Sequence, residues 1–215
     1  MKKSFYTILI AVFFAQCSTL KVTTSLESYG IKEGATENVQ NTLKIQAALD
    51  AAPLYSDIII PKGKYYISDA IYPREGQRLI FNGSLKLNDN GKAVLRMISL
   101  KAPNVQLINP ILDMDRDNNT FDNLSGTQAI ISNYGKGFNC KVTGGKLING
   151  IDNFFQGGRT GLIFDGTVFE NCGEHAFYVN GIDPDGNYGD LTFRNLDIKN
   201  VALDASHSEG HCFQF

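Results

Sequence analysis

The sequence contains no tryptophan, few histidines and no excess of charge of either sign. A formal net charge of −2 over 215 residues gives no reason to expect a nucleic-acid partner. The four cysteines include no Cys-x-x-Cys pair, which excludes the zinc and redox sites built on that motif. Beyond the first residues, no apolar run is long enough to span a bilayer. What remains is a chain that is 43% hydrophobic, enough for one sizeable domain, with nine tyrosines and fourteen phenylalanines as its aromatic surface.

The N-terminus has the pattern of an export signal. Lys2 and Lys3 precede an apolar run from Phe5 to Phe14 that is too short to cross a membrane. Ala15-Gln16-Cys17 resembles a bacterial lipoprotein cleavage site with Cys17 as the lipidated residue, and an ordinary secretory signal is the alternative. Both place the mature chain outside the cytoplasm, as an outer-membrane or cell-surface lipoprotein or as a secreted protein. We expect a signal peptide over 1–16, a polar tether over 17–28 and one folded domain over 29–215.

A short apolar pattern returns four times in the second half of the chain. Its central residues, which recur at intervals of roughly 23 to 36 residues, are Ile130, Phe154, Phe177 and Phe213. A period of that length, carried by short strand-like runs, is typical of coils stacked on one another. We expect these four residues to form one interior column. Their neighbours then point outward as a ladder: Ile131, Phe155, Tyr178 and Gln214.

A second apolar column repeats out of phase with the first. Its members are Leu79-x-Phe81, Val105-x-Leu107, Cys140-x-Val142, Leu162-x-Phe164 and Leu191-x-Phe193. A residue suited to a bend with positive φ follows each of them: Gly83, Asn109, Gly144, Gly166 and Asn195. Two columns that keep pace along the chain imply at least two strands in each coil. The pattern therefore predicts an all-β, single-stranded parallel β-helix.

One segment has helical rather than strand-like spacing. Residues 38–52 place Val39, Leu43 and Ala47 with Ile45, Ala48, Leu49 and Ala52 on one broad apolar stripe. Pro53 should end this helix, because its ring cannot continue the turn. An amphipathic helix before a stack of β-coils is expected to cover the first coil, whose open edge would otherwise invite aggregation.

The segment around this helix resembles a known superfamily. Tyr29-Gly30, the helix end Ile45-Gln46-Ala47-Ala48-Leu49-Asp50 and the run Ile58-Ile59-Ile60-Pro61-x-Gly63-x-Tyr65 resemble the N-terminal signature of pectate-lyase-like right-handed β-helices. That group includes rhamnogalacturonase, polygalacturonase and epimerase-like domains. Its usual Asp-Asp-Thr at the helix start is replaced here by Gln40-Asn41-Thr42. The resemblance implies a right-handed parallel β-helix with an N-terminal capping helix, and it says little about chemistry.

The outward ladder is the exposed face of the stacked coils, where we expect the functional residues to lie. Phe155 above Tyr178, with Gln214 beyond them, would offer aromatic faces to sugar rings, unless following loops cover them. Arg159 follows two glycines after a ladder strand and could grip the carboxylate of an acidic sugar. Arg194 alternates with Phe193 and is expected on an outer wall away from the groove.

Two histidines and one acidic loop are the candidates for catalysis. His175 is the leading acid/base, and His211 occupies the equivalent position one repeat later. Asp183 and Asp185, in a long insertion that also holds Asp190, are candidate catalytic residues and weak candidate calcium ligands; good turn chemistry is the alternative. Calcium is the cofactor that these residues suggest.

A second acidic cluster consists of Asp113, Asp115, Asp117 and Asp122. It resembles the start of a calcium loop, but the glycine and the final glutamate of that motif are absent, so a solvated loop is the default interpretation.

Three cysteines lie beyond Cys17. Cys140 falls in the second interior column and is expected to be a small core residue, whereas Cys172 and Cys212 lie near coil corners. Their irregular spacing favours separate buried thiols over a disulfide, which export would permit.

The resemblance implies a polysaccharide-degrading ancestry. The expected function is lyase or glycoside hydrolase action on an acidic polysaccharide such as pectin, and the alternative is a non-catalytic glycan-binding or structural surface protein. The hydrolase series Asn-Thr-Asp, Asp-Asp, Gly-His-Gly and Arg-x-Lys is missing as a set, so no catalytic role is carried over. No capping element follows Phe215, which predicts that the chain is part of a longer protein.

Overall fold

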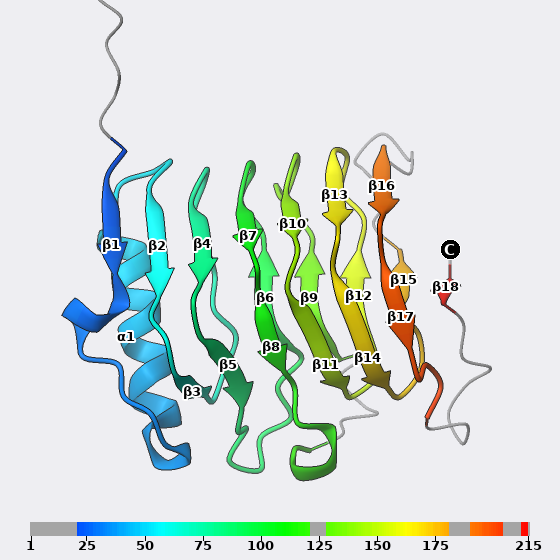
Figure 1. Cartoon of the computed structure of the whole chain (residues 1–215), viewed down its shortest axis with the longest axis horizontal. Helices are drawn as coiled ribbons and strands as arrows, with labels where there is room; N and C mark the ends of the chain where they lie inside the picture. Colours follow the sequence, from blue (N-terminus) through cyan, green and yellow to red (C-terminus); the bar gives the residue numbers. More distant parts are fainter. Residues whose placement is uncertain (1–20, 121–127, 181–189, 204–211, 215) are drawn as a thin grey trace, which may run out of the picture.

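A computed structural model describes residues 21–120, 128–180, 190–203 and 212–214. The chain winds as a stack of coils, and strands from successive coils pair side by side into three parallel sheets (Figure 1). The seven-stranded sheet is ordered β1-β2-β4-β7-β10-β13-β16, the six-stranded sheet β17-β14-β11-β8-β5-β3, and the five-stranded sheet β18-β15-β12-β9-β6. Backbone groups of one coil are therefore satisfied by the coils on either side.

The seven-stranded sheet contains β1 (Thr23–Ser25), β2 (Asp57–Ile60), β4 (Arg78–Phe81), β7 (Gln106–Ile108), β10 (Lys141–Thr143), β13 (Leu162–Asp165) and β16 (Leu191–Arg194). The six-stranded sheet contains β3 (Lys64–Ile67), β5 (Ser84–Leu87), β8 (Ile111–Asp113), β11 (Lys146–Gly150), β14 (Val168–Cys172) and β17 (Asp197–Lys199). The five-stranded sheet contains β6 (Arg96–Leu100), β9 (Ala129–Asn133), β12 (Asn153–Gly157), β15 (Phe177–Val179) and β18 (Phe213–Gln214). The helical elements are α1 (Asn38–Ala51) and three 3₁₀ turns, η1 (Leu26–Tyr29), η2 (Ala35–Glu37) and η3 (Arg116–Asn118).

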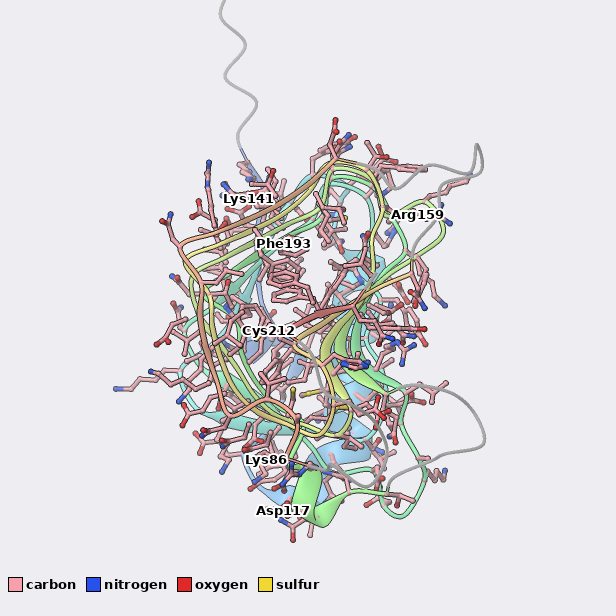
Figure 2. The ribbon with its side chains drawn as sticks, turned by 90° about the vertical axis from the view of Figure 1, so that its right-hand side faces the viewer. Lys86, Asp117, Lys141, Arg159, Phe193 and Cys212 are labelled. Carbon is pink, nitrogen blue, oxygen red and sulfur yellow. The ribbon has the colours of Figure 1, made fainter. Side chains whose placement is uncertain are left out.

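The second apolar column lies inside the seven-stranded sheet, as the sequence predicts. Its aligned members are Leu79, Leu107, Val142, Phe164 and Phe193. One pairing differs from the expected one, because Leu79 aligns with Leu107 rather than with Val105. A shift of two residues keeps every side chain on the same face, so the interior is unchanged. Seen along the stack, Phe193 points inward and Lys141 outward (Figure 2).

The bends predicted after this column adopt the left-handed conformation at four of five positions. Their φ values are 51° at Asn109, 63° at Gly144, 72° at Gly166 and 55° at Asn195. Gly83 is not in that conformation. Glycine is required at position 83 because there is no room for a side chain: a Cβ there would lie 2.2 Å from the carbonyl oxygen of Pro61.

A different corner of the stack carries a ladder of side-chain amides. Asn149 donates to Asp113 over 2.9 Å, Asn171 donates to Asn149 over 3.1 Å, and Asn200 donates to Asn171 over 2.9 Å. All three asparagines have positive φ. Each one therefore forms a bend and joins its coil to the previous coil.

The first apolar column was predicted with a slip of one residue between Phe154 and Phe177, whereas Phe177 and Phe213 pair as predicted. The register pairs Phe155 with Ile131 and with Phe177, and Phe177 with Phe213. Phe155 is thus an interior residue and not part of an outward ladder. Phe154 is also fully buried, with its ring centroid 5.4 Å from that of Phe169, while Phe155 packs 5.2 Å from Phe164. Two consecutive interior side chains break the alternation on which the alignment relied.

Helix α1 covers the first coil and packs against β3, and Ala52 leaves the helix in an extended conformation directly before Pro53 (Figure 1). Its buried face differs from the predicted stripe, because Val39, Leu43 and Ala47 are exposed. The buried residues are Asn38, Asn41, Thr42, Ile45, Ala48 and Leu49. Within the described residues, no helix combines the length and apolar content needed to cross a membrane.

Polar side chains fix the helix to the coil beneath it. The fully buried Asn41 accepts a hydrogen bond from the Lys32 amide over 2.9 Å and donates to the carbonyls of Lys32 and Tyr66 over 2.7 and 3.1 Å. Thr42 accepts from the Ser68 amide over 2.8 Å. Asn41 is thus a cross-link rather than a helix cap, and a carboxylate could not make its two donations.

The folded part of the chain begins before the predicted boundary at residue 29. Thr23–Ser25, expected within the tether, pairs in parallel with β2 as strand β1, and the buried Leu26 follows it. The unsatisfied backbone edge of β2 explains why even this polar segment is ordered as a strand.

The cross-link at Asn41 predicts a specific loss of stability. Asn41→Ala should lower the free energy of unfolding by about 2 to 3 kcal/mol, because it leaves one part-buried amide and two carbonyls without their partner. Gln40→Ala, at the exposed neighbouring position, should change it by less than about 0.5 kcal/mol. Urea denaturation of both variants measures the difference. Equal effects would mean that Asn41 contributes no more than an ordinary helix position.

Candidate functional site

The outer face of the five-stranded sheet carries one polar column. The register aligns Ser99 with Ser132, Ser132 with Gln156, Gln156 with Tyr178, and Tyr178 with Gln214. Tyr72 precedes Ser99 in this column, because Ile71 forms a parallel bridge with Ile98. Successive rungs are roughly 4.8 Å apart. The hydroxyls of Ser99 and Ser132 lie 3.0 Å from each other.

A cleft of about 490 Å³ opens at the N-terminal end of this column. Its lining includes three cationic side chains, Lys92, Arg96 and Lys101, and one exposed carboxylate, Asp69. Tyr72 and Tyr134 supply aromatic surface, and Ser99 lies at the base. The cleft therefore combines positive charge with the exposed ring of Tyr72 and the half-buried ring of Tyr134, a combination suited to an anionic ligand that also has flat or apolar faces.

Arg96 and Tyr134 meet across the polar column. Arg96 is the first residue of β6. Its guanidinium donates to the side-chain oxygen of Gln156 and to the backbone carbonyl of Leu95, the preceding residue. It also forms a side-chain hydrogen bond with Tyr134, which follows β9. The Tyr134 hydroxyl lies 2.7 Å from the side-chain oxygen of Asn180. These contacts cover the central rungs, which explains why Ser132 is buried.

Burial governs the ionisation of this pair. It lowers the pKa of Arg96, an effect that Tyr134 and Asp152 oppose, and a guanidinium stays charged under these conditions. Burial also raises the pKa of Tyr134 above its ordinary value, against the opposing influence of Arg96. At neutral pH the pair is therefore a cation beside a neutral phenol.

The rim of the cleft is held by a cation–π contact. The Lys101 ammonium lies 5.0 Å from the centre of the Tyr72 ring. Both side chains are exposed, so the ring and the charge are accessible together.

The leading acid/base candidate, His175, is buried. Only 5% of its surface is exposed, and its ring stacks on Tyr178 with centroids 6.0 Å apart. Its backbone amide donates to Asn153 over 3.1 Å. The imidazole supports the ring of Tyr178 but does not line the cleft. His211, Asp183 and Asp185 lie outside the described residues, as does Cys17.

The substrate-binding candidates divide into three groups. Tyr178 and Gln214 are half-buried members of the polar column, as predicted, beyond the cleft. Phe155 is fully buried, for the register reason given above, and cannot contact a ligand from there. Arg159 lies on a loop at the edge of the molecule, where its backbone amide donates to Asn133 over 2.7 Å, and it is not part of the cleft lining (Figure 2).

The acidic cluster around Asp113 is an ion-pair network. Lys86 lies 2.9 Å from Asp115 and 3.5 Å from Asp113, whereas Asp117 is exposed and Asp122 is outside the described residues (Figure 2). Across the described ranges, no group of three His, Cys, Asp or Glu side chains could hold a metal ion. Arg194 forms a 2.8 Å ion pair with Asp165 on the outer wall, away from the cleft, as expected.

Sequence reasoning missed the cationic and aromatic residues of the cleft. Arg96 begins β6, a strand that was not part of the repeat alignment. Tyr134 directly follows β9, the strand at which that alignment began. Tyr72 follows Ile71, which forms an isolated β-bridge and does not belong to an apolar run that would predict a strand. The usable signal was the pair Ile98-Ser99, which recurs as Ile131-Ser132 and aligns with it once the coils are stacked.

Comparison with known structures identifies the architecture. A "putative glycosyl hydrolase" from Parabacteroides merdae aligns with a TM-score of 0.52 and 17% identity, covering 83% of this chain and 94% of that one. The A-module of the mannuronan C-5 epimerase AlgE6 from Azotobacter vinelandii aligns with a TM-score of 0.50 and 16% identity, covering 80% of this chain and 55% of that one. No family model and no curated protein matches the sequence.

The fold is a parallel β-helix. In this β-helix Cys140 is the core residue that the sequence predicts, and Cys172 is also fully buried. Cys212 was expected to be buried as well and is exposed instead. None of these three described cysteines forms a disulfide. Burial raises the pKa of Cys140 to about 12 and that of Cys172 to about 12.

These pKa values predict selective alkylation. At pH 8 iodoacetamide should modify Cys212 and spare Cys140 and Cys172, because a thiol with a pKa of about 12 is protonated at that pH and both are inaccessible. Peptide mapping by mass spectrometry gives the extent at each cysteine. The same reaction in guanidinium chloride is the control and should modify all three. Native modification of Cys140 at the rate of Cys212 would contradict the buried column.

Proposed function

We propose that this β-helix binds an acidic polysaccharide in the cleft between Tyr72 and Tyr134. The observation that carries the proposal is the excess of cations in the described lining of the cleft, where Lys92, Arg96 and Lys101 accompany one exposed carboxylate, Asp69. A uronic acid unit offers a carboxylate for these cations and a ring face for the tyrosines. The fold shared with carbohydrate-active structures supports this choice by analogy.

Cleavage by β-elimination is the second candidate. Elimination requires a cation to neutralise the uronate carboxylate, a base that takes the proton from the neighbouring carbon, and an acid for the departing oxygen. In the described lining the Arg96 guanidinium, which is placed beside the Tyr134 hydroxyl, would be the cation, and Asp69 would be the base. With its raised pKa, Tyr134 is a proton donor at neutral pH and suits the departing glycosidic oxygen. Hydrolysis is less favoured, because it uses two carboxyl groups and the described lining contains only Asp69.

Affinity measurements with variants test the binding proposal. Lys101→Ala should weaken binding of polygalacturonate or mannuronan about tenfold, since it removes one charge-assisted contact. Lys136→Ala removes an exposed charge outside the cleft and should leave the affinity unchanged. Calorimetric titration of both variants and the parent provides the values. Binding of neither polymer, or equal losses in the two variants, would overturn the proposal.

Turnover assays separate binding from catalysis. The parent chain is incubated with the same polymers, and unsaturated and new reducing ends are measured. Unsaturated ends that disappear in Tyr134→Phe indicate elimination. Binding without either product indicates a glycan-binding protein.

We also propose that the protein is exported and attached to a membrane through Cys17, on the evidence of its N-terminal sequence. Cys17→Ser should abolish incorporation of radiolabelled fatty acid in the producing cell. Unchanged incorporation would contradict a lipid at Cys17.

A further inference from the structure

A column of left-handed residues lies where the coils enter the seven-stranded sheet. The backbone amide of each residue donates to the carbonyl just before the next member, with Tyr55 bonded to Glu75 over 3.2 Å and Gly76 to Pro103 over 3.0 Å. The φ values are 60° at Tyr55, 67° at Gly76, 61° at Asn104, 55° at Asn139 and 77° at Gly161. The chain thus makes the same turn in five successive coils.

Tyr55 is the exception in this column. Glycine and asparagine adopt positive φ readily, and the other four positions use them. A bulky aromatic residue in this conformation is an outlier, and such strain concentrates at functional positions. Turn geometry alone would select asparagine or glycine, so the tyrosine ring itself requires an explanation.

The ring of Tyr55 is held in a fixed position. It lies against Gly76, where a Cβ would be only 2.1 Å from its Cδ1 atom. Its hydroxyl donates to the carboxylate of Glu75 and also interacts with Asn104. The side chain nevertheless remains 53% exposed. One face is therefore covered by the backbone of the next coil, and the exposed remainder is available to a ligand.

This ring borders a second cleft of about 670 Å³. Asn104 and Gln106 contribute amide groups, and Arg78 contributes a guanidinium that is paired with Asp57 over 2.6 Å. Leu54 adds exposed apolar surface beside the ring. A rigid aromatic plane next to planar polar groups matches a pyranose, which has an apolar ring face and hydroxyls around its edge.

We propose that Tyr55 is the platform of a second glycan-binding site, which takes one pyranose unit on its exposed side. The hydroxyls of that unit are within the reach of Asn104, Gln106 and Arg78. Among the described residues the two clefts share none of their lining, so this site does not depend on the proposed function of the first cleft.

Nuclear magnetic resonance of the full chain, labelled with ¹³C in the tyrosine rings, tests the proposal. The Tyr55 signal is assigned as the one lost in Tyr55→Asn. Hexasaccharides of galacturonate, mannuronate and glucose are the probes. At least one should shift the Tyr55 signal in a saturable manner, both in the parent and in Lys101→Ala, where the first cleft is impaired. A Tyr55 signal that moves with none of the three, or that stops moving in Lys101→Ala, would overturn the second site.

Variants at position 55 separate binding from structure. In the Lys101→Ala background, Tyr55→Asn should weaken binding of the active hexasaccharide about five- to tenfold. It should melt at or above the temperature of that background, because asparagine occupies the same turn at Asn104 and Asn139. Tyr55→Phe keeps the ring and should retain binding. If Tyr55→Asn melts lower and binds the sugar unchanged, the ring is a structural cap and the proposal fails.

Discussion

In-register parallel pairing between coils is the constraint on which the whole structure depends. It brings residues of different coils into vertical contact, so that Ser99 meets Ser132 and Phe177 meets Phe213. The interior consequence is a column of rings, in which Phe177 stacks on Phe213 with centroids 4.9 Å apart. The exterior consequence is a polar column on the five-stranded sheet. The first cleft lies at the N-terminal end of that column, around Tyr72 and Ser99.

The corners keep this alignment from slipping. A one-residue shift in any strand would turn its interior face to solvent. The asparagine ladder through Asn149, Asn171 and Asn200 opposes such a shift, because each side chain bonds the equivalent position in the neighbouring coil. At the N-terminal end, the hydrogen bonds of Asn41 fix the position of helix α1 on the first coil. Both proposed glycan sites lie on this framework, one on a sheet face and one at a corner, where side chains are held by rigid strands.

How much of this the sequence could predict depends on the local pattern. Isolated apolar pairs followed by asparagine or glycine predicted the interior of the seven-stranded sheet and four of its five bends correctly, because alternation and turn chemistry are local properties. The five-stranded sheet was misaligned at Phe154 and Phe155, since two adjacent apolar residues give no indication of which one faces inward. The helix face was also wrong, because Asn41 and Thr42 are buried by hydrogen bonds that hydropathy does not show.

The candidate site was the least predictable part. Arg96 and Gln156 are neighbours only after the intervening coil, which carries β9, is placed, and Tyr134 meets Arg96 through a side-chain hydrogen bond. No spacing in the sequence indicates that Arg96 contacts Gln156 and Tyr134. Tyr178 was found because it belongs to a recognisable repeat, whereas Tyr55 is identified only by its backbone conformation.

Distances between spin labels along the outer wall test the stacking most directly. Thr23, Gln106, Lys141 and Thr192 belong to one outward column of the seven-stranded sheet. With Cys212→Ser as background, labels at Thr23 and Gln106, Thr23 and Lys141, and Thr23 and Thr192 are compared by pulsed electron paramagnetic resonance. Stacked coils predict separations of roughly 14, 19 and 29 Å, which correspond to three, four and six rungs. Separations that do not increase in proportion to the number of rungs would contradict the stack and both sites built on it.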